Sequence, residues 1–297
     1  MGNKEKRMKK AAPFLVAAAA VLWGMLVVFV RRLGDGGFSA MDIVCLRAYG
    51  SVAFLFPGLF LINRKLLKIR LKDTWCFVGT GVFSIVFFSY CYFRNVEVSS
   101  VAFSSILMYT SPVWVTLLSA VCFRERISRR KLSALFLALL GCVLVSGITG
   151  GAGCISIYGI LLGLGSGIGY GLYSIFGRYA LNRGYHPMTV TAYTFLFACV
   201  GVLPFVRIPS IIEKLGTDPM LWATALGMAF FTTTMSFSLY TMGLCYLEPG
   251  QAAVLATLEP IVSTLVGVFF YRELLTVSML MGIALVLFSS ILISKNG

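Results

Sequence analysis

Two stretches decide the fold of this chain: LMYTSPVWVTLLSAVCFRE at residues 107–125 and LATLEPIVSTLVGVFFYRE at residues 255–273. They align without a gap at an offset of 148 residues, close to half of the chain. A second pair, WGMLVVFVR at residues 23–31 and YGLYSIFGR at residues 170–178, matches at an offset of 147 residues. The chain is therefore predicted to be one unit that occurs twice.

The composition indicates a membrane protein. Of the 297 residues, 59% are hydrophobic and 12% are charged, and the mean hydropathy is +0.90. Apolar runs long enough to cross a bilayer as helices recur, and they are continuous rather than alternating, which excludes a β-barrel. The prediction is an all-α polytopic membrane protein with ten transmembrane helices, near residues 12–30, 41–62, 74–93, 100–123, 132–149, 157–179, 188–206, 219–245, 251–271 and 276–294.

The net charge of +14 reflects topology rather than a nucleic-acid partner. With the N-terminus inside, the cytoplasmic segments hold 18 Lys and Arg residues and the opposite segments hold 6. By the positive-inside rule, both termini are expected in the cytoplasm, and the excess charge adds attraction to anionic membrane lipid. We expect no nucleic-acid binding and place the protein in the bacterial inner (cell) membrane.

The two units are expected to lie in opposite orientations. Each unit holds five spans, and an odd number makes equivalent helices cross the membrane in opposite directions. The predicted domains are a first repeat at 1–149, a Gly-rich linker at 150–156 and a second repeat at 157–297. Transporters built from such inverted repeats bind substrate between the repeats, near the middle of the bilayer.

This arrangement resembles the drug/metabolite transporter superfamily, EamA type. The resemblance rests on Trp23-Gly24, the run from Pro112 to Ser128, and Leu258-Glu259-Pro260 with the run to Thr276, and it covers the chain as two tandem copies. It implies export or exchange of amino acids or other small metabolites. It also implies that spans 1, 3, 4, 6, 8 and 9 line a central cavity, which makes these residues pathway candidates: Trp23, Tyr90, Tyr109, Tyr170 and Glu259.

Two charged residues stand inside predicted spans. Glu259 lies among leucines in span 9, where a carboxylate is costly and usually faces a cavity or a partner. It is expected to bind substrate or a proton, or to make a structural hydrogen bond. Arg47 in span 2 is expected to anchor an anionic group such as a carboxylate, or to pair with a neighbouring helix. The equivalent positions hold Ser111 and Thr194.

Pro112 and Pro260 occupy matched positions inside spans 4 and 9. A proline there deprives the carbonyl four residues earlier of its partner, so both helices are predicted to kink. The kinks are gating hinges in one interpretation and fixed packing features in the other. Span 6 carries Gly at every fourth position from 159 to 171, which indicates close helix packing or a sliding face.

The leading hypothesis is a secondary transporter that moves a small polar or amphipathic metabolite by alternating access. The alternative is a polytopic membrane enzyme acting on a lipid-linked substrate. Such enzymes usually need paired carboxylates, a histidine base or a metal cluster, whereas this chain has one histidine, His186, and no close acid pair deep in a span. We expect no enzymatic activity, cofactor or metal. A homodimer, the direction of transport and proton coupling stay open.

Overall fold

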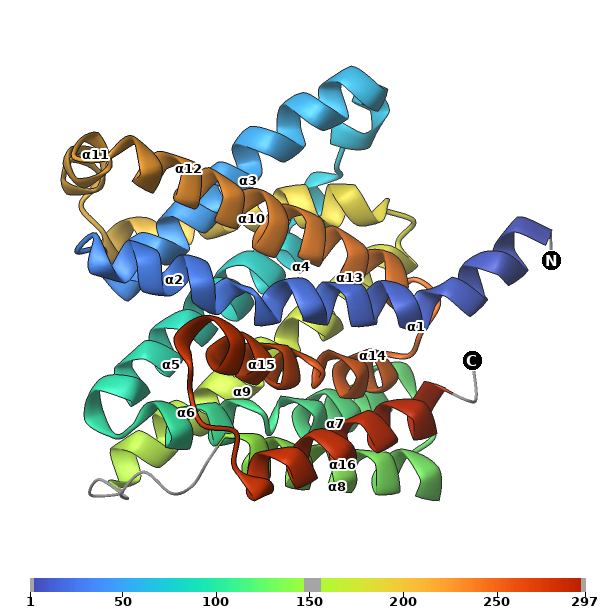
Figure 1. Ribbon diagram of the computed structural model, residues 1–297. Helices are drawn as coiled ribbons and strands as arrows, with labels where there is room; N and C mark the ends of the chain where they lie inside the picture. The colour runs from blue at the N-terminus through green and yellow to red at the C-terminus, as the bar shows by residue number, and fades with distance from the viewer. Residues whose placement is uncertain (1–2, 147–155, 295–297) are drawn as a thin grey trace.

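The computed structural model describes residues 3–146 and 156–294, and within these residues the chain folds into helices and contains no strand (Figure 1). Nine of the described helical segments are long and apolar enough to cross a membrane. The tenth expected span is α8 (Arg129–Val145), which is shorter and packs along α16 (Val277–Ser294). The prediction of an all-α polytopic membrane protein is confirmed. The expected linker lies outside the described residues, except for Ser156.

The two halves pass through equivalent elements in the same order. The first half consists of α1 (Asn3–Gly24), α2 (Leu26–Asp35), α3 (Ala40–Asn63), η1 (Arg64–Leu67), η2 (Leu71–Asp73), α4 (Thr74–Val78), η3 (Gly79–Val86), α5 (Phe87–Val98), α6 (Val101–Met108), α7 (Ser111–Phe123) and α8. The second half consists of α9 (Ile157–Asn182), α10 (Pro187–Val202), η4 (Leu203–Phe205), α11 (Ile208–Gly216), α12 (Pro219–Gly227), η5 (Met228–Met235), α13 (Ser236–Leu244), α14 (Pro249–Ala256), α15 (Glu259–Tyr271) and α16. In both halves the third span contains a π-helix, η3 or η5, and the fourth span is broken in two.

The first span of each half packs against the other half. Helix α1 contacts α13, α14 and α15, whereas α9 contacts η3, α5, α6 and α7. We call α1, α2, α12, α13, α14 and α15 the α1 bundle. We call α4, η3, α5, α6, α7 and α9 the α9 bundle. An ion pair ties each bundle at an equivalent corner: Arg32 Nη2 lies 3.4 Å from Asp218 Oδ2, and Arg183 Nε lies 3.0 Å from Asp73 Oδ1.

Glycines allow the helices within a bundle to approach closely. A Cβ on Gly163 of α9 would lie 2.2 Å from the side chain of Leu107, and one on Gly167 would lie 2.6 Å from Thr110 Oγ1. In the α1 bundle, a Cβ on Gly243 would lie 2.5 Å from Val16. The glycine face of span 6 therefore contacts span 4 of its own bundle, as expected for small residues at membrane helix interfaces.

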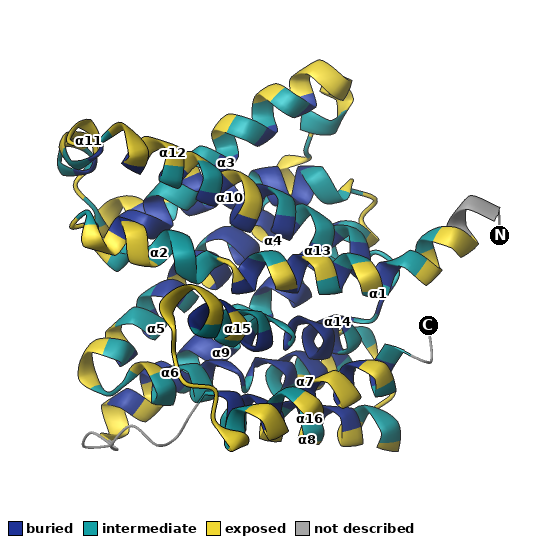
Figure 2. Ribbon diagram, viewed as in Figure 1, coloured by how far each residue is buried: buried dark blue, intermediate teal, exposed yellow. Residues whose placement is uncertain are grey.

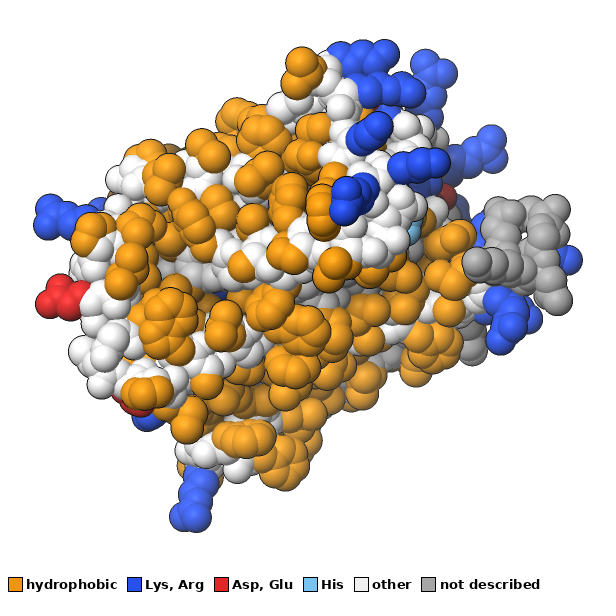
Figure 3. Space-filling view, turned by 90° about the horizontal axis from the view of Figure 1, so that it is seen from above, with side chains coloured by type: hydrophobic (Ala, Val, Ile, Leu, Met, Phe, Trp, Pro, Cys, Tyr) orange, Lys and Arg blue, Asp and Glu red, His pale blue; other side chains and the backbone are white. Residues whose placement is uncertain are grey.

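The two ends of the molecule differ in charge. The start of α1 and the end of α16 lie at one end, which we call the terminal end, and α11 lies at the opposite, far end (Figure 1). Between the ends, exposed positions face outward and buried ones face neighbouring helices (Figure 2). A broad hydrophobic surface covers the middle, while most Lys and Arg side chains in view gather at the terminal end (Figure 3). This pattern suits a protein embedded in a bilayer.

Candidate functional site

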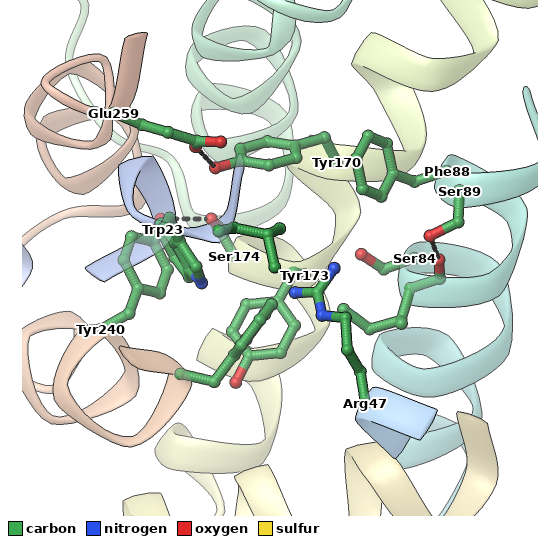
Figure 4. A pocket seen from close by; sticks show the side chains of 13 residues that line it. Trp23, Arg47, Ser84, Phe88, Ser89, Tyr170, Tyr173, Ser174, Tyr240 and Glu259 are labelled. Carbon is green, nitrogen blue, oxygen red and sulfur yellow. Dashed lines mark hydrogen bonds between the residues drawn. The ribbon is translucent and has the colours of Figure 1, made fainter. Parts of the chain in front are cut away.

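A central cavity lies between the two bundles. Its empty volume, which includes space open to solvent, is about 590 Å³. Helices of both halves contribute its walls, and the polar and aromatic side chains are Trp23, Arg47, Ser84, Phe88, Ser89, Tyr170, Tyr173, Ser174, Phe237, Tyr240 and Glu259 (Figure 4). Four of the predicted pathway residues, Trp23, Arg47, Tyr170 and Glu259, are thus brought together.

Glu259 is placed in the cavity by the break in span 9. Helix α14 ends at Ala256, and α15 begins at Glu259, so the carboxylate stands in the first turn of a helix, where the dipole favours a negative charge. Tyr170 of α9 donates a hydrogen bond from its hydroxyl to Glu259 Oε2 over 2.9 Å. Because α15 and α9 belong to different bundles, this bond joins the two bundles at the cavity.

Arg47 faces Glu259 from the other side. Its Nε donates to Thr233 Oγ1 of η5 over 3.1 Å, which fixes the side chain while part of the guanidinium lines the cavity. Figure 4 shows the guanidinium and the carboxylate on opposite sides of the cavity, and these two described residues form no ion pair with each other. The cavity therefore presents a separated positive and negative charge to whatever occupies it.

Trp23 contributes a hydrogen-bond donor. Its side chain packs edge-on against Phe237, with ring centroids 5.0 Å apart, and against Tyr170 at 6.3 Å. Its Nε1 is buried and has no hydrogen-bond partner among the described residues. Leaving a buried donor unpaired is unfavourable, so this N–H suits an acceptor atom on a molecule in the cavity.

The two remaining predicted tyrosines lie elsewhere. Tyr109 packs in a small apolar cluster with Met108 and Ile261, beside Tyr170, and lines a second cavity at the far end. The ring of Tyr90 packs on Phe205 at a centroid distance of 5.2 Å, and Tyr90 is not among the residues of the central cavity. A pathway role for either tyrosine stays a prediction.

The predicted proline kinks are complete breaks. Pro112 and Pro260 stand in the first turns of α7 and α15, and two residues separate each of these helices from the one before it. Proline fits a first turn because the missing N–H would have no partner there. Hydroxyls add hydrogen bonds at the two breaks: Thr110 donates to the Leu107 carbonyl, and Thr257 donates to the Val254 carbonyl, both over 2.6 Å. Whether the breaks act as gates stays a prediction.

Sequence reasoning did not select several residues of the cavity. Ser174 and Tyr240 are hydrogen-bonded to each other over 2.7 Å, and Ser84 and Ser89 come from span 3. The available signal was a set of hydroxyl side chains inside otherwise apolar spans. The π-helix at Gly79–Val86 shifts the helical face, so regular helical spacing does not predict which of them reach the cavity. The described residues contain no cluster of His, Cys, Asp or Glu that could hold a metal ion.

Comparison with known proteins agrees with this architecture. The EamA-like transporter family matches twice, at residues 10–147 and 157–295. An uncharacterized transporter of Archaeoglobus fulgidus is 28% identical over 92% of this chain and 92% of its own length. A probable amino-acid metabolite efflux pump of Salmonella typhimurium is 21% identical over 94% of this chain and 93% of its own length. A crystal structure with 17% sequence identity superposes with a TM-score of 0.78, covering 95% of this chain and 96% of that one, which shows a shared fold.

Duplicated apolar helices around a central, charge-lined cavity define a membrane transporter. The chain belongs to the EamA-like transporter family. The relatives compared above are named as transporters, which places this protein with transporters rather than with the enzymes considered as the alternative.

Proposed function

We propose that this protein is a secondary carrier for a small metabolite bearing both a carboxylate and an amine, such as an amino acid, which it exports or exchanges by alternating access. The observation that carries the proposal is the placement of Arg47 and Glu259 on opposite sides of the cavity. A guanidinium binds a carboxylate through two parallel hydrogen bonds, and a carboxylate binds an ammonium group. A zwitterion that spans the cavity would neutralise both charges.

The rest of the cavity suits the remainder of such a molecule. Trp23 offers an unpaired donor, and the rings of Phe88 and Phe237 offer an apolar surface for a side chain. Ligand sites of this kind combine mainly apolar walls with a few placed polar groups. The printed name of the Salmonella typhimurium relative, which refers to an amino-acid metabolite, supports the same substrate class.

The proposal includes the orientation and organisation of the chain. The gathering of basic side chains at the terminal end supports cytoplasmic termini in a bacterial inner membrane. The family matches at residues 10–147 and 157–295 support two repeats that meet between residues 149 and 157.

The test begins with metabolites. Cells with and without the protein are compared for accumulated and secreted small molecules, and flux of each candidate is then measured in liposomes at two pH values. We expect saturable flux of an amino acid or a close relative. Arg47→Met should abolish the preference for the acid over its amide, and Glu259→Gln should abolish the preference for the amine over its deaminated analogue.

Matched controls keep the outcome specific. Arg207→Met and Glu97→Gln remove the same charges outside the cavity and should leave flux unchanged. Glu259→Gln should also remove any pH dependence if Glu259 carries a proton. Equal flux of the amide, the deaminated analogue and the parent compound would refute the zwitterion site, and substrate turnover without flux would refute the carrier.

A further inference from the structure

The two ends of the molecule are in different states. At the terminal end, α7 packs against α14, and a Cβ on Gly250 would lie 3.1 Å from Thr116 Oγ1. At the far end, the equivalent helices α15 and α6 instead form the walls of the second cavity, which includes Ser105 and Thr264. Thr116 is buried, whereas its repeat equivalent Thr264 is partly exposed. The bundles therefore meet at the terminal end and stand apart at the far end.

Arg31 at the far end makes its contacts within one bundle. Its Nη2 lies 2.5 Å from Glu273 Oε1, and its guanidinium lies 4.0 Å from the centroid of the Tyr271 ring. Arg31 belongs to α2, Tyr271 ends α15, and Glu273 lies in the corner that follows α15, so all three lie in the α1 bundle. This contact leaves the far end open.

Arg178 is the repeat equivalent of Arg31 and makes contacts between the bundles. Its Nη1 donates to the carbonyl of Leu244 over 2.6 Å and to that of Leu247 over 3.4 Å. Arg178 belongs to α9, whereas Leu244 ends α13 and Leu247 lies between α13 and α14, both in the α1 bundle. The arginine therefore holds the terminal end closed.

We propose that Arg31 and Arg178 exchange these two kinds of partner when the bundles rock. The proposal rests on the alternating access proposed above, in which the two inverted repeats trade conformations. In the opposite state, Arg178 pairs with Glu125 and stacks on Phe123, the equivalents of Glu273 and Tyr271. Arg31 then donates to the backbone carbonyls at the end of α5, which opens the terminal end and closes the far end.

Glu125 is well placed to receive Arg178. It lies two residues after the end of α7, which packs against α9, and its side chain is 11% exposed. Its described cationic neighbour is Lys131, whose Nζ lies 3.6 Å away and also contacts Glu248. Burial raises the pKa of the Glu125 carboxyl, so its charged form gains from a second cation.

The experiment measures how often the terminal end opens. A cysteine at Thr116 reports this opening through its rate of maleimide labelling in detergent, and a cysteine at Thr264 reports the far end. The accessible described thiols Cys122 and Cys245, together with Cys154 outside the described residues, are replaced by Ser. If Thr116→Cys does not fold, Ala253→Cys, on a neighbouring buried position, takes its place.

Double-mutant cycles then isolate each proposed pair. In a Lys131→Met background, Glu125→Gln should slow labelling at position 116 about two- to fivefold, the size expected when the opposite state loses a single ion pair. This effect should disappear when Arg178→Gln is also present. Glu273→Gln should speed the same labelling by a similar factor, and only while Arg31 is intact. Glu213→Gln, an exposed acid on α11, serves as the control.

The outcomes separate this proposal from the function. If Glu125→Gln acts equally with and without Arg178, the exchange of partners is refuted, even when liposome flux is normal. If the couplings appear but no saturable flux is found, the carrier is refuted and the exchange stands, because labelling requires no substrate.

Discussion

The corner between α7 and α8 and the corner between α15 and α16 occupy equivalent positions in the two repeats, yet they carry different charges. At the terminal end, Lys131 forms ion pairs with Glu125 and with Glu248, the N-cap residue of α14. The equivalents of Lys131 and Glu248 at the far end are Met279 and Ser100, which cannot form this pair.

The backbone of the two corners is nevertheless the same. Arg124 and Arg272 both end their helices in the left-handed conformation, with φ of 56° and 55°. Ser128 caps α8 by accepting from the Lys131 N–H, and Thr276 accepts in the same way from the Met279 N–H. Duplication thus supplies a symmetric backbone, on which the two corners carry different charged side chains.

The largest effect is expected from a substitution that disrupts helix packing inside one bundle. Gly163→Leu would force a side chain into Leu107 and should prevent folding of the α9 bundle, at a cost of at least about 1–3 kcal/mol. The yield of monodisperse protein and its thermal unfolding measure this. Gly58→Leu, which meets open space on α3, should be tolerated. Normal yield of the Gly163 variant would show that the bundle is not tightly packed.

The next largest effect is expected when a side chain of the terminal corner is replaced by its equivalent from the far corner. Lys131→Met removes the cation that links the bundles at that end, so labelling of a cysteine at Thr116 should rise about tenfold, or about 1.4 kcal/mol. Lys72→Met changes an exposed lysine away from this corner and should leave the labelling rate unchanged. An unchanged rate in Lys131→Met would show that helix packing alone keeps this end closed.

A smaller effect is expected inside the cavity, where Trp23 and Tyr170 are repeat equivalents. Trp23→Phe removes the unpaired indole N–H and should raise the KM for transport about fivefold, the value of one hydrogen bond of about 1 kcal/mol. Thermal unfolding should shift little because no described partner is lost. A rise in KM that is matched by a large loss of thermal stability would instead indicate a packing role.

The smallest effect is expected from building a new contact. Met279→Lys together with Ser100→Glu copies the terminal pair onto the far end and should slow labelling of a cysteine at Thr264 about threefold, as expected of an exposed ion pair. Each single variant is the control and should have little effect. If the double variant behaves as the sum of the singles, the two corners are less equivalent than their sequences indicate.

The sequence predicted the plan of the fold because duplication and hydrophobicity are local properties. The match at Pro112 and Pro260, together with runs of apolar residues, was sufficient for an all-helical membrane protein of two inverted repeats. The packing of α1 and α9 each against the other half of the chain could not be predicted, because all spans are similarly apolar and hydrophobicity does not specify which pairs of spans pack together.

The charged part of the site was easier to predict than the rest. Arg47 and Glu259 are costly in a membrane, so each was expected to face either a cavity or a partner on a neighbouring helix, and both line the central cavity. Tyr90 and Tyr240 looked alike as aromatic residues inside spans, yet only Tyr240 lines the cavity. The π-helices η3 and η5 change the face that each third span presents, and no simple sequence period reports that change.

The position of α1 has a consequence for biogenesis. Ala12, Val16 and Ala19 are fully buried, mainly against helices that the ribosome makes more than 200 residues later. Until those helices leave the translocon, this alanine-rich face must rest in lipid, which its small apolar side chains tolerate. The pocket is therefore completed only after the last third of the polypeptide has entered the bilayer.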